Sequence, residues 1–174
     1  MKSLKSLLLL SFFCLLALSC GDDEIAYNPN EQYQIDLAKI TKYLADNDID
    51  AQGDATGLFY TIDVETSNEF ARQGNNVTVN YELYNFNGEL LDTNLESVAK
   101  AGGIFSSTRQ YAPFPVLLGA GRVIPGFERA LYLLKLGEKG TFYIPSVLGY
   151  QNQSLGNIGP NENLIFVIEM LTIE

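Results

Sequence analysis

The spacing of apolar residues changes from a helical to a β period along the chain. Between residues 31 and 46 the apolar positions recur every three or four residues: Tyr33, Leu37, Ile40 and Leu44. This spacing puts them on one face of a helix over 31–46, for which Asn30 is the expected N-cap. A helix of this length is marginal alone in water, so we expect it to pack on the main domain or on a partner.

From about residue 57 apolar and polar positions alternate, as in strands with one buried face. The alternating positions form two runs: Leu58, Tyr60, Ile62 and Val64, then Val77, Val79, Tyr81 and Leu83. Asn87 and Gly88 follow the second run, and both tolerate the positive φ of a type I′ turn, so they predict a hairpin. Further strands are expected near 139–145 and 163–173. The last is apolar on both faces, which indicates a central strand.

One short helix is expected within this β region. It should begin at Pro125, and its apolar positions have helical spacing: Phe127, Ala130, Leu131 and Leu134. Gly137 is the expected C-cap residue. Residues 95–112 form a long polar connection, and connections of that length are usually functional or mobile. A short helix among mostly antiparallel strands defines an α+β domain.

Charge and composition narrow the function classes. The chain of 174 residues has a formal net charge of −10. A surface of that sign repels phosphate backbones, so nucleic-acid binding is not expected. The sequence contains no histidine, which excludes His-based triads and almost all familiar catalytic metal sites.

The first twenty residues have the pattern of an export signal. Two lysines precede an apolar run at 7–18, which is too short to span a bilayer comfortably. The tetrapeptide at 17–20, Ala-Leu-Ser-Cys, resembles a bacterial lipobox, in which Cys20 would be lipidated and would start the mature protein. An ordinary signal peptide cleaved near Ser19, leaving Cys20 as an unpaired thiol, is the alternative.

These patterns predict three parts of the chain. They are a lipoprotein signal peptide at 1–19, an acidic tether with the N-terminal helix at 20–56, and the main domain at 57–174. The acidic stretch at 21–24 resembles an export tract of some lipoproteins of Bacteroidetes-like bacteria, and a simple solvated tether is the alternative. We expect a protein of the bacterial cell envelope that is attached to the outer membrane through a lipid on Cys20. The sequence leaves open whether it lies on the periplasmic or the outer face of that membrane.

Seven short motifs follow one another in the main domain. They are Val77-Thr-Val-Asn-Tyr81, Leu91-Asp92, Pro113-Phe114, Leu118-Gly-Ala-Gly-Arg-Val-Ile-Pro-Gly-Phe127, Gly137-Glu-Lys139, Ile144-Pro-Ser-Val-Leu-Gly-Tyr150 and Ile158-Gly-Pro-Asn-Glu-Asn-Leu-Ile-Phe166. In this order and spacing they resemble the FKBP-type peptidyl-prolyl cis-trans isomerases over nearly their whole domain. The resemblance implies a curved antiparallel β-sheet wrapped around one short α-helix, to which this chain adds an N-terminal helix.

The resemblance also implies an aromatic pocket between sheet and helix. Carried over by position, the pocket residues are Tyr81, Asp92, Phe114, Val123, Ile124, Phe127, Tyr150, Ile158 and Phe166. Leu91 and Asp92 are expected at one wall, and Tyr150 and Ile158 at the rim. The Tyr150 hydroxyl and the Ile124 backbone N–H are the implied donors to a substrate carbonyl, whereas Asp92 would orient polar groups. Plain core packing is the alternative for any one of these aromatic residues.

Rotation of an X–Pro bond suits such a pocket on chemical grounds. The barrier of about 18–20 kcal/mol comes from amide resonance, which places negative charge on the carbonyl oxygen. A dry aromatic cavity should favour the twisted, less polar amide without an acid, a base, a metal or a cofactor. The expected partners are proline-containing polypeptides of the envelope. A non-catalytic FKBP-like binding or chaperone module, or a structural lipoprotein that reuses the fold, are the alternative functions.

Three positions depart from the family pattern. Leu91 stands where phenylalanine is common, Phe127 where tryptophan is common, and Gln151 where a glycine usually follows the rim tyrosine. The first two make the pocket less aromatic, so we expect lower activity than a typical member and weaker binding of macrolide ligands. The connection at 95–112 is longer than the family pattern, and we predict that it flanks the pocket and selects partners.

Overall fold

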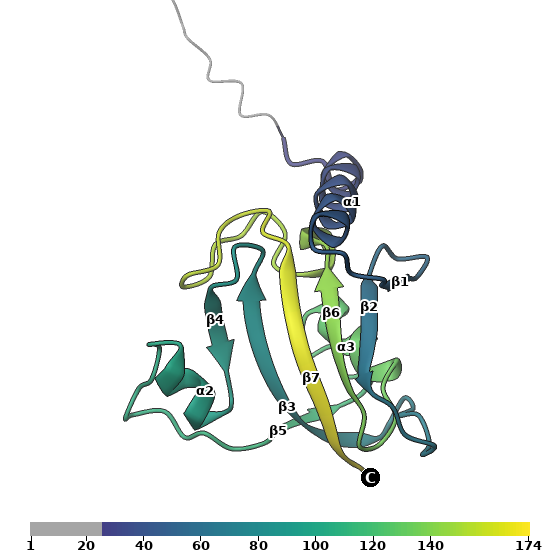
Figure 1. Ribbon diagram of the computed structural model, residues 1–174, viewed down its shortest axis with the longest axis vertical. Helices are drawn as coiled ribbons and strands as arrows, with labels where there is room; N and C mark the ends of the chain where they lie inside the picture. The colour runs from purple at the N-terminus through teal and green to yellow at the C-terminus, as the bar shows by residue number, and fades with distance from the viewer. Residues whose placement is uncertain (1–25) are drawn as a thin grey trace, which may run out of the picture.

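The computed structural model describes residues 26–174, so Cys20, the predicted signal peptide at 1–19 and the acidic stretch at 21–24 lie outside the described residues. The elements follow in the order α1 (Pro29–Asp46), β1 (Gln52–Gly53), β2 (Phe59–Val64), β3 (Asn76–Asn85), β4 (Leu90–Thr93), α2 (Glu96–Ala101), β5 (Phe114–Leu117), α3 (Pro125–Tyr132), β6 (Lys139–Ile144), η1 (Ser146–Leu148) and β7 (Leu164–Ile173). A curved antiparallel sheet lies beside α3, and α1 crosses one end of the sheet (Figure 1). Within 26–174 no helix has both the length and the apolar character needed to cross a membrane.

The sheet has the strand order β1-β2-β6-β7-β3-β4, so β7 is central, as predicted. Strand β3 pairs with β4 through residues 82–84 and with β5 through residues 76–79. Two short strands therefore share one edge of β3. Asn80 and Tyr81 lie between the two paired stretches. Opposite them the chain leaves the sheet at the end of β4, and it returns to the sheet as β5.

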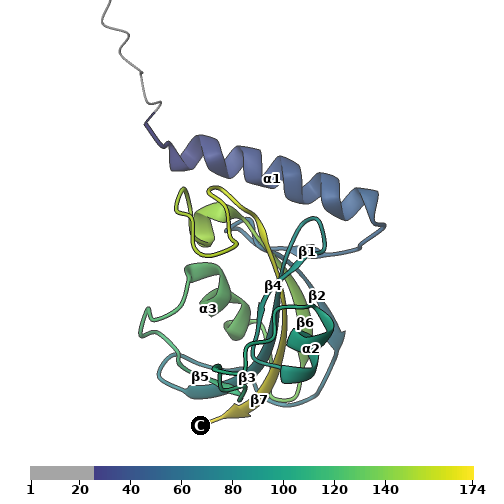
Figure 2. The same cartoon turned by 90° about the vertical axis from the view of Figure 1, so that its left-hand side faces the viewer.

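The sheet has an inner and an outer face because successive side chains of a strand point to opposite sides. On the inner face Phe142 of β6 lies opposite Phe166 of β7, and both belong to the main core with α3. Their neighbours Tyr143 and Ile165 point outward and pack with Ile40 of α1. The predicted N-terminal helix thus packs on the main domain, and Figure 2 shows α1 lying across the end of the sheet, apart from α3.

Helix α3 begins at Pro125, as predicted, because proline at the first helical position loses no hydrogen bond. The helix ends at Tyr132, and the prediction that Gly137 caps it is wrong. Gly137 instead has φ +80° in the turn before β6, where its N–H donates to the Met170 carbonyl at 2.9 Å. Leu134 lies beyond the helix end but is fully buried, so its apolar character reflects burial rather than helix.

Helix α1 begins before the predicted position. Its N-cap is Asn28, whose side chain accepts from the N–H of Asn30 at 3.1 Å and from that of Glu31. The prediction of Asn30 as the N-cap is wrong because Pro29 is already suited to the first helical position.

The turn between β3 and β4 is a hairpin, but not of type I′. Gly88 has φ +81°, whereas Asn87 does not have the positive φ that a type I′ turn requires. The Asn85 side chain explains the difference, because its oxygen accepts from the N–H groups of Asn87 and Glu89, both at 3.0 Å. These bonds stabilise a longer loop with a single glycine in the left-handed region.

The connection at 95–112 was predicted to be a loop throughout, but α2 occupies its first part. Ala99 of this helix is fully buried and anchors it to the domain. The main domain therefore contains α2 and the short η1 as well as the one helix that was predicted.

The packing of α1 on the sheet predicts unequal effects of two identical substitutions. Ile40 is fully buried and Ile35 is 43% exposed on the same helix. We expect Ile40→Ala to lower the free energy of unfolding by about 2–5 kcal/mol because it leaves a cavity against the outer face of the sheet. Ile35→Ala should change it by less than about 0.5 kcal/mol. Urea unfolding of both variants measures this, and equal effects would contradict the packing described.

Candidate active site

A cavity of about 430 Å³ lies between β3 and α3. Its lining residues are Tyr81, Leu83, Asp92, Phe114, Gly121, Arg122, Val123, Ile124, Phe127, Tyr150 and Phe166. Hollows of about 650 Å³ and 740 Å³ lie elsewhere on the described surface, but each has a single aromatic ring, Tyr84 in one and Tyr27 in the other. The cavity at α3 combines five rings in its wall, which makes it the candidate site for an apolar cyclic group.

Four of the rings form one connected cluster. Phe127 lies 5.0 Å from Phe166, 6.0 Å from Tyr81 and 6.3 Å from Phe114, measured between ring centroids. The interplanar angles are 66–83°, the edge-to-face arrangement that aromatic quadrupoles favour. Phe127 and Phe166 are each only 4% exposed, whereas Phe114 is 37% exposed. The cavity thus has a rigid buried floor and one ring at its open edge.

A polar group of three side chains stands at one wall. The Tyr81 hydroxyl donates to Asp92 at 2.7 Å, and the Arg109 guanidinium forms an ion pair with the same carboxylate. Arg109 also donates to the Tyr81 hydroxyl at 3.1 Å. Both oxygens of Asp92 therefore have partners and its charge is balanced, which supports an orienting role rather than that of a base.

The pKa values of this group follow from its contacts. Burial of the phenol and its hydrogen bond to Asp92 raise the pKa of Tyr81 to about 12, with Arg109 acting in the opposite direction. The hydrogen bond to Asp92 raises the pKa of Arg109. At neutral pH the phenol is protonated and the guanidinium charged. Residues 26–174 hold no cluster of three or more His, Cys, Asp or Glu side chains suited to a metal ion.

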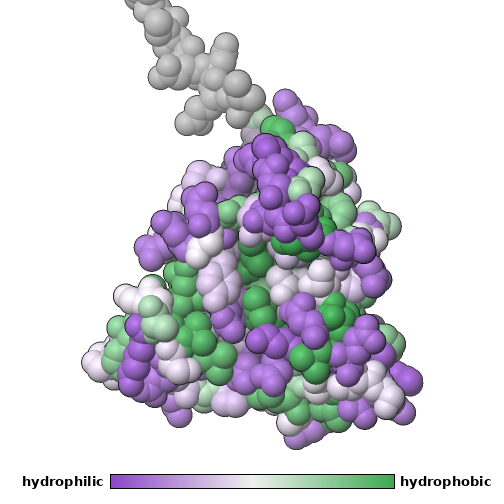
Figure 3. Space-filling view, viewed as in Figure 1, coloured by the Kyte–Doolittle hydropathy of each residue, from purple (hydrophilic) through white to green (hydrophobic). Residues whose placement is uncertain are grey.

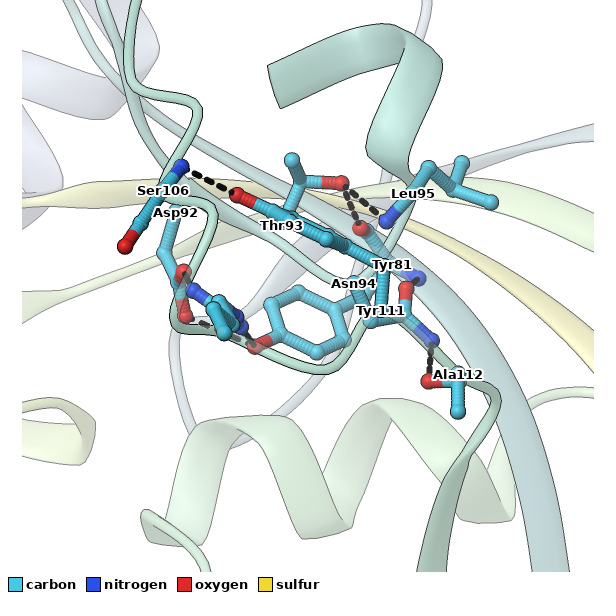
Figure 4. Close-up of polar contacts among 9 residues, drawn as sticks. Tyr81, Asp92, Thr93, Asn94, Leu95, Ser106, Tyr111 and Ala112 are labelled. Atoms are coloured by element: carbon cyan, nitrogen blue, oxygen red, sulfur yellow. Dashed lines mark hydrogen bonds and ion pairs between the residues drawn. The ribbon is translucent and has the colours of Figure 1, made fainter. Parts of the chain in front are cut away.

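The backbone of Tyr81 is held by Thr93, the last residue of β4, and by Asn94, which follows it (Figure 4). The Asn94 side chain accepts from the Tyr81 N–H at 2.8 Å and donates to the carbonyls of Val79 and Ala112, both at 3.0 Å. The Thr93 hydroxyl donates to the Tyr81 carbonyl at 2.7 Å. These bonds replace the missing strand partner of β3 and fix the ring of Tyr81 over the cavity.

Among the hydrogen-bond donors of the cavity that have no partner within residues 26–174, two can face a peptide bound on the rings. One is the Tyr150 hydroxyl and the other is the backbone N–H of Ile124, which precedes α3. Burial and then the negative charge of Asp92 raise the pKa of Tyr150, so its hydroxyl stays protonated at neutral pH. Both groups are able to donate to a carbonyl oxygen of a bound peptide.

Eight of the nine predicted pocket residues line this cavity. Ile158 does not, since it is 7% exposed in the main core and its backbone pairs with Leu155. Leu91, expected beside Asp92 at the wall, instead lines the separate hollow between β4 and α2. The register of β4 is irregular at this point: Asp92 pairs with Leu83 and Leu90 pairs with Tyr84, so Leu91 lies between them without a partner on β3. Figure 3 shows apolar residues gathered over β4 and α2.

The sequence analysis missed four residues of the site: Leu83, Arg109, Gly121 and Arg122. The sequence could have predicted Leu83, because a residue two positions after Tyr81 on a strand faces the same side of the sheet. The two residues before Val123 belong to a motif that was recognised. Arg109 lies in a connection without periodicity, and its one signal is that it is the only charged residue in 101–121.

Comparison with known proteins agrees with this geometry. Residues 67–171 match the family described as FKBP-type peptidyl-prolyl cis-trans isomerase. A probable FKBP-type peptidyl-prolyl cis-trans isomerase FkpA of Neisseria meningitidis is 36% identical over 120 residues, which are 68% of this chain and 39% of that protein. Outer membrane protein MIP of Legionella longbeachae is 35% identical over 121 residues, 68% of this chain and 45% of that protein.

The fold is also that of a solved structure. The crystal structure of FkpA from Escherichia coli superposes with a TM-score of 0.62 at 24% identity, covering 84% of this chain and 62% of that one. A curved antiparallel sheet with a ring-lined cavity beside one helix defines the class, and the sequence match defines the family. The chain belongs to the FKBP-type peptidyl-prolyl cis-trans isomerase family. It spans less than half the length of the Neisseria and Legionella relatives.

The polar wall generates a prediction for the titration of Tyr81. Asp92→Asn removes the carboxylate that accepts from the phenol and leaves the Arg109 charge beside it. Both changes favour tyrosinate, so the pKa of Tyr81 should fall from about 12 toward its ordinary value. Tyrosine-labelled NMR, assigned with Tyr81→Phe, measures the shift. Tyr143, whose pKa burial also raises to about 12, should not respond and is the control. An unchanged Tyr81 would contradict the described contact.

Proposed function

We propose that the protein is a peptidyl-prolyl cis-trans isomerase that acts on proline-containing polypeptides. The observation that carries this proposal is the ring-lined cavity of about 430 Å³ that contains the unpaired donors Tyr150 and the Ile124 N–H. A pyrrolidine ring fits on the floor made by Phe127 and Phe166. The donors are then available to the carbonyls that flank the proline.

The chemistry follows from desolvation. A planar amide carries more charge separation than a twisted one, so removing its water raises the energy of the planar form more. The Phe127 and Phe166 rings exclude water, and hydrogen bonds from Tyr150 and Ile124 hold the flanking backbone without opposing rotation. Arg109 pairs with Asp92, the one carboxylate among the residues that line the cavity. No unpaired negative charge therefore faces the bound amide.

The connection at 95–112 is proposed to select partners. It carries Arg109 to the polar wall, and its Tyr111 accepts from the Ser106 N–H at 3.0 Å and stacks with Phe105 at 5.6 Å between ring centroids. Phe105 is 42% exposed. This arrangement supports a role in contacting the polypeptide beyond the proline.

The cell envelope is the proposed location, with the chain divided into signal peptide 1–19, tether and helix 20–56, and isomerase domain 57–174. Two observations support it: the lipobox-like sequence ending at Cys20 and the similarity to a relative named outer membrane protein MIP. The proposed clients are exported proteins, whose folding slow prolyl steps can limit.

An isomerisation assay with prolyl peptides tests the proposed activity. We expect the purified full-length protein to accelerate cis-trans exchange. Tyr150→Phe should lower kcat/KM about tenfold, the effect of losing one hydrogen bond of about 1–1.5 kcal/mol. Asp92→Ala and Phe127→Ala should also lower it, through the polar wall and the floor. The matched control is Tyr132→Phe, which makes the same change on α3 outside the cavity.

The same assay separates catalysis from simple binding. Wild-type rates equal to the uncatalysed rate, with the fold intact by circular dichroism, would rule out the isomerase. Binding of an unlabelled prolyl peptide without acceleration would instead establish the binding module, and a Tyr132→Phe effect as large as that of Tyr150→Phe would remove Tyr150 from the site.

Acylation of Cys20 is tested separately. Mass spectrometry of protein extracted from membranes should show a mature chain that starts at Cys20 and carries acyl groups. Cys20→Ser should abolish the modification and release the protein from the membrane fraction, because several buried acyl chains at about 0.8 kcal/mol per methylene supply the attachment. An unmodified Cys20, or a chain that begins elsewhere, would contradict the anchor.

A further inference from the structure

A fully buried carboxylate joins the N-terminal helix to the loop of Tyr150. Asp36 of α1 has 0% exposure. Its side chain accepts from the Ser146 hydroxyl at 2.6 Å, from the Val147 N–H at 3.3 Å and from the Gln32 side chain at 2.8 Å. No ion pair involves Asp36 within residues 26–174. A buried carboxylate without a cation is costly unless hydrogen bonds satisfy it, so these contacts are strongly constraining.

A second side chain closes the network. The Asn163 amide donates to the Asp36 backbone carbonyl at 3.4 Å, and its oxygen accepts from the Ser146 N–H at 3.0 Å. Asn163 is 5% exposed and Ser146 is fully buried. Ser146 is thus held at its backbone and its hydroxyl by two partners that also contact each other. A buried polar network satisfied in this way fixes one arrangement of its members.

Ser146 in turn is hydrogen-bonded to the two residues that flank Tyr150. The Ser146 carbonyl accepts from the N–H groups of Gly149 and Gln151, both at 2.9 Å. Tyr150 lies between these two residues and lines the cavity. The direction of its side chain is therefore set by a backbone segment that is hydrogen-bonded to Ser146.

The conformation of Gln151 shows why this segment needs to be held. Gln151 has φ +56°, in the left-handed region that glycine adopts without strain and other residues do not. Such strain persists only where the surroundings fix the backbone. The carbonyl of Gln151 accepts from the Asn161 N–H at 2.6 Å, and its N–H is bonded to Ser146. A loop with glutamine at this position depends more on its supports than a loop with glycine.

We propose that Asp36 is a positioning residue that holds the Ser146–Gln151 segment and thereby places the Tyr150 hydroxyl at the cavity. The proposal rests on the proposed isomerase function. Asp36 lies outside residues 67–171, the part that matches the family. Helix α1 is then a working part of the site and not only an attachment between a tether and the domain.

The competing explanation is that Asp36 only stabilises the packing of α1. Ile40 provides the matched control, since it is also fully buried on α1 but packs with Tyr143 and Ile165 on the outer face of the sheet. A general loosening of α1 affects Ile40→Ala and Asp36→Ala alike. A positioning role affects the Tyr150 segment only in the Asp36 variant.

The test measures kcat and KM for prolyl peptides with the full-length protein. We expect Asp36→Ala to lower kcat/KM about fivefold, and Ile40→Ala to change it less than twofold at a temperature where both variants are folded. Asp36→Asn keeps an acceptor for the Ser146 hydroxyl and should restore kcat/KM to within about twofold of wild type. In the Asp36→Ala background, Tyr150→Phe should cost less than about twofold, against about tenfold alone, because residues that act through one another are not additive.

Hydrogen exchange provides a measurement that needs no activity. The Gly149 and Gln151 amides should exchange at least about tenfold faster in Asp36→Ala than in Ile40→Ala. Unchanged exchange, or a full Tyr150→Phe effect in the Asp36→Ala background, overturns the positioning role. If wild type is inactive, the isomerase function fails while the exchange comparison still decides the role of Asp36. If Asp36→Ala does not fold, Ser146→Ala replaces it, since it removes the same hydroxyl contact.

Discussion

The site depends on the hydrogen bonds that Thr93 and Asn94 make to the backbone of Tyr81. At this point β3 has no strand partner on one edge, and buried backbone groups without partners are costly. The two side chains take the place of a strand and allow β4 to end there. The chain is then free to form the connection at 95–112 before β5 resumes the pairing. If a continuous strand paired with β3 here instead of these two side chains, it would cover Tyr81. The connection that brings Arg109 to Asp92 could then not form.

Much of this arrangement could be predicted from the sequence because it is local and periodic. Alternation identified β2 and β3, and apolarity on both faces identified the central position of β7, whereas β1 and β5 were not predicted. The errors occurred where a side chain decides between backbone alternatives. Asn28, not Asn30, caps α1, and Asn85 converts the expected tight turn into a longer one. Periodicity contains no information about such contacts, because it is a pattern over many residues, whereas a single side chain decides each cap or turn.

Arg109 and Asp36 were beyond prediction for a different reason. Each contacts its partners over a long sequence separation, 17 residues from Arg109 to Asp92 and 110 from Asp36 to Ser146. A polar residue on an amphipathic helix is expected to face water, and only the fold shows that Asp36 faces the η1 segment instead. The order of the seven motifs located the cavity because it encodes the same fold, but Asp36 lies before the first of them.

The two long-range contacts act on one cavity in complementary ways. Arg109 pairs with Asp92, the only carboxylate among the described residues of the wall, so the rings of Phe127 and Phe166 face no unpaired negative charge. Asp36 keeps its own charge outside the cavity and contributes geometry alone, through Ser146, to the donor Tyr150. Desolvation favours a twisted amide only if the flanking peptide is held in register with the floor. A less aromatic pocket, which Leu91 does not line, therefore depends more on the fixed position of its donors.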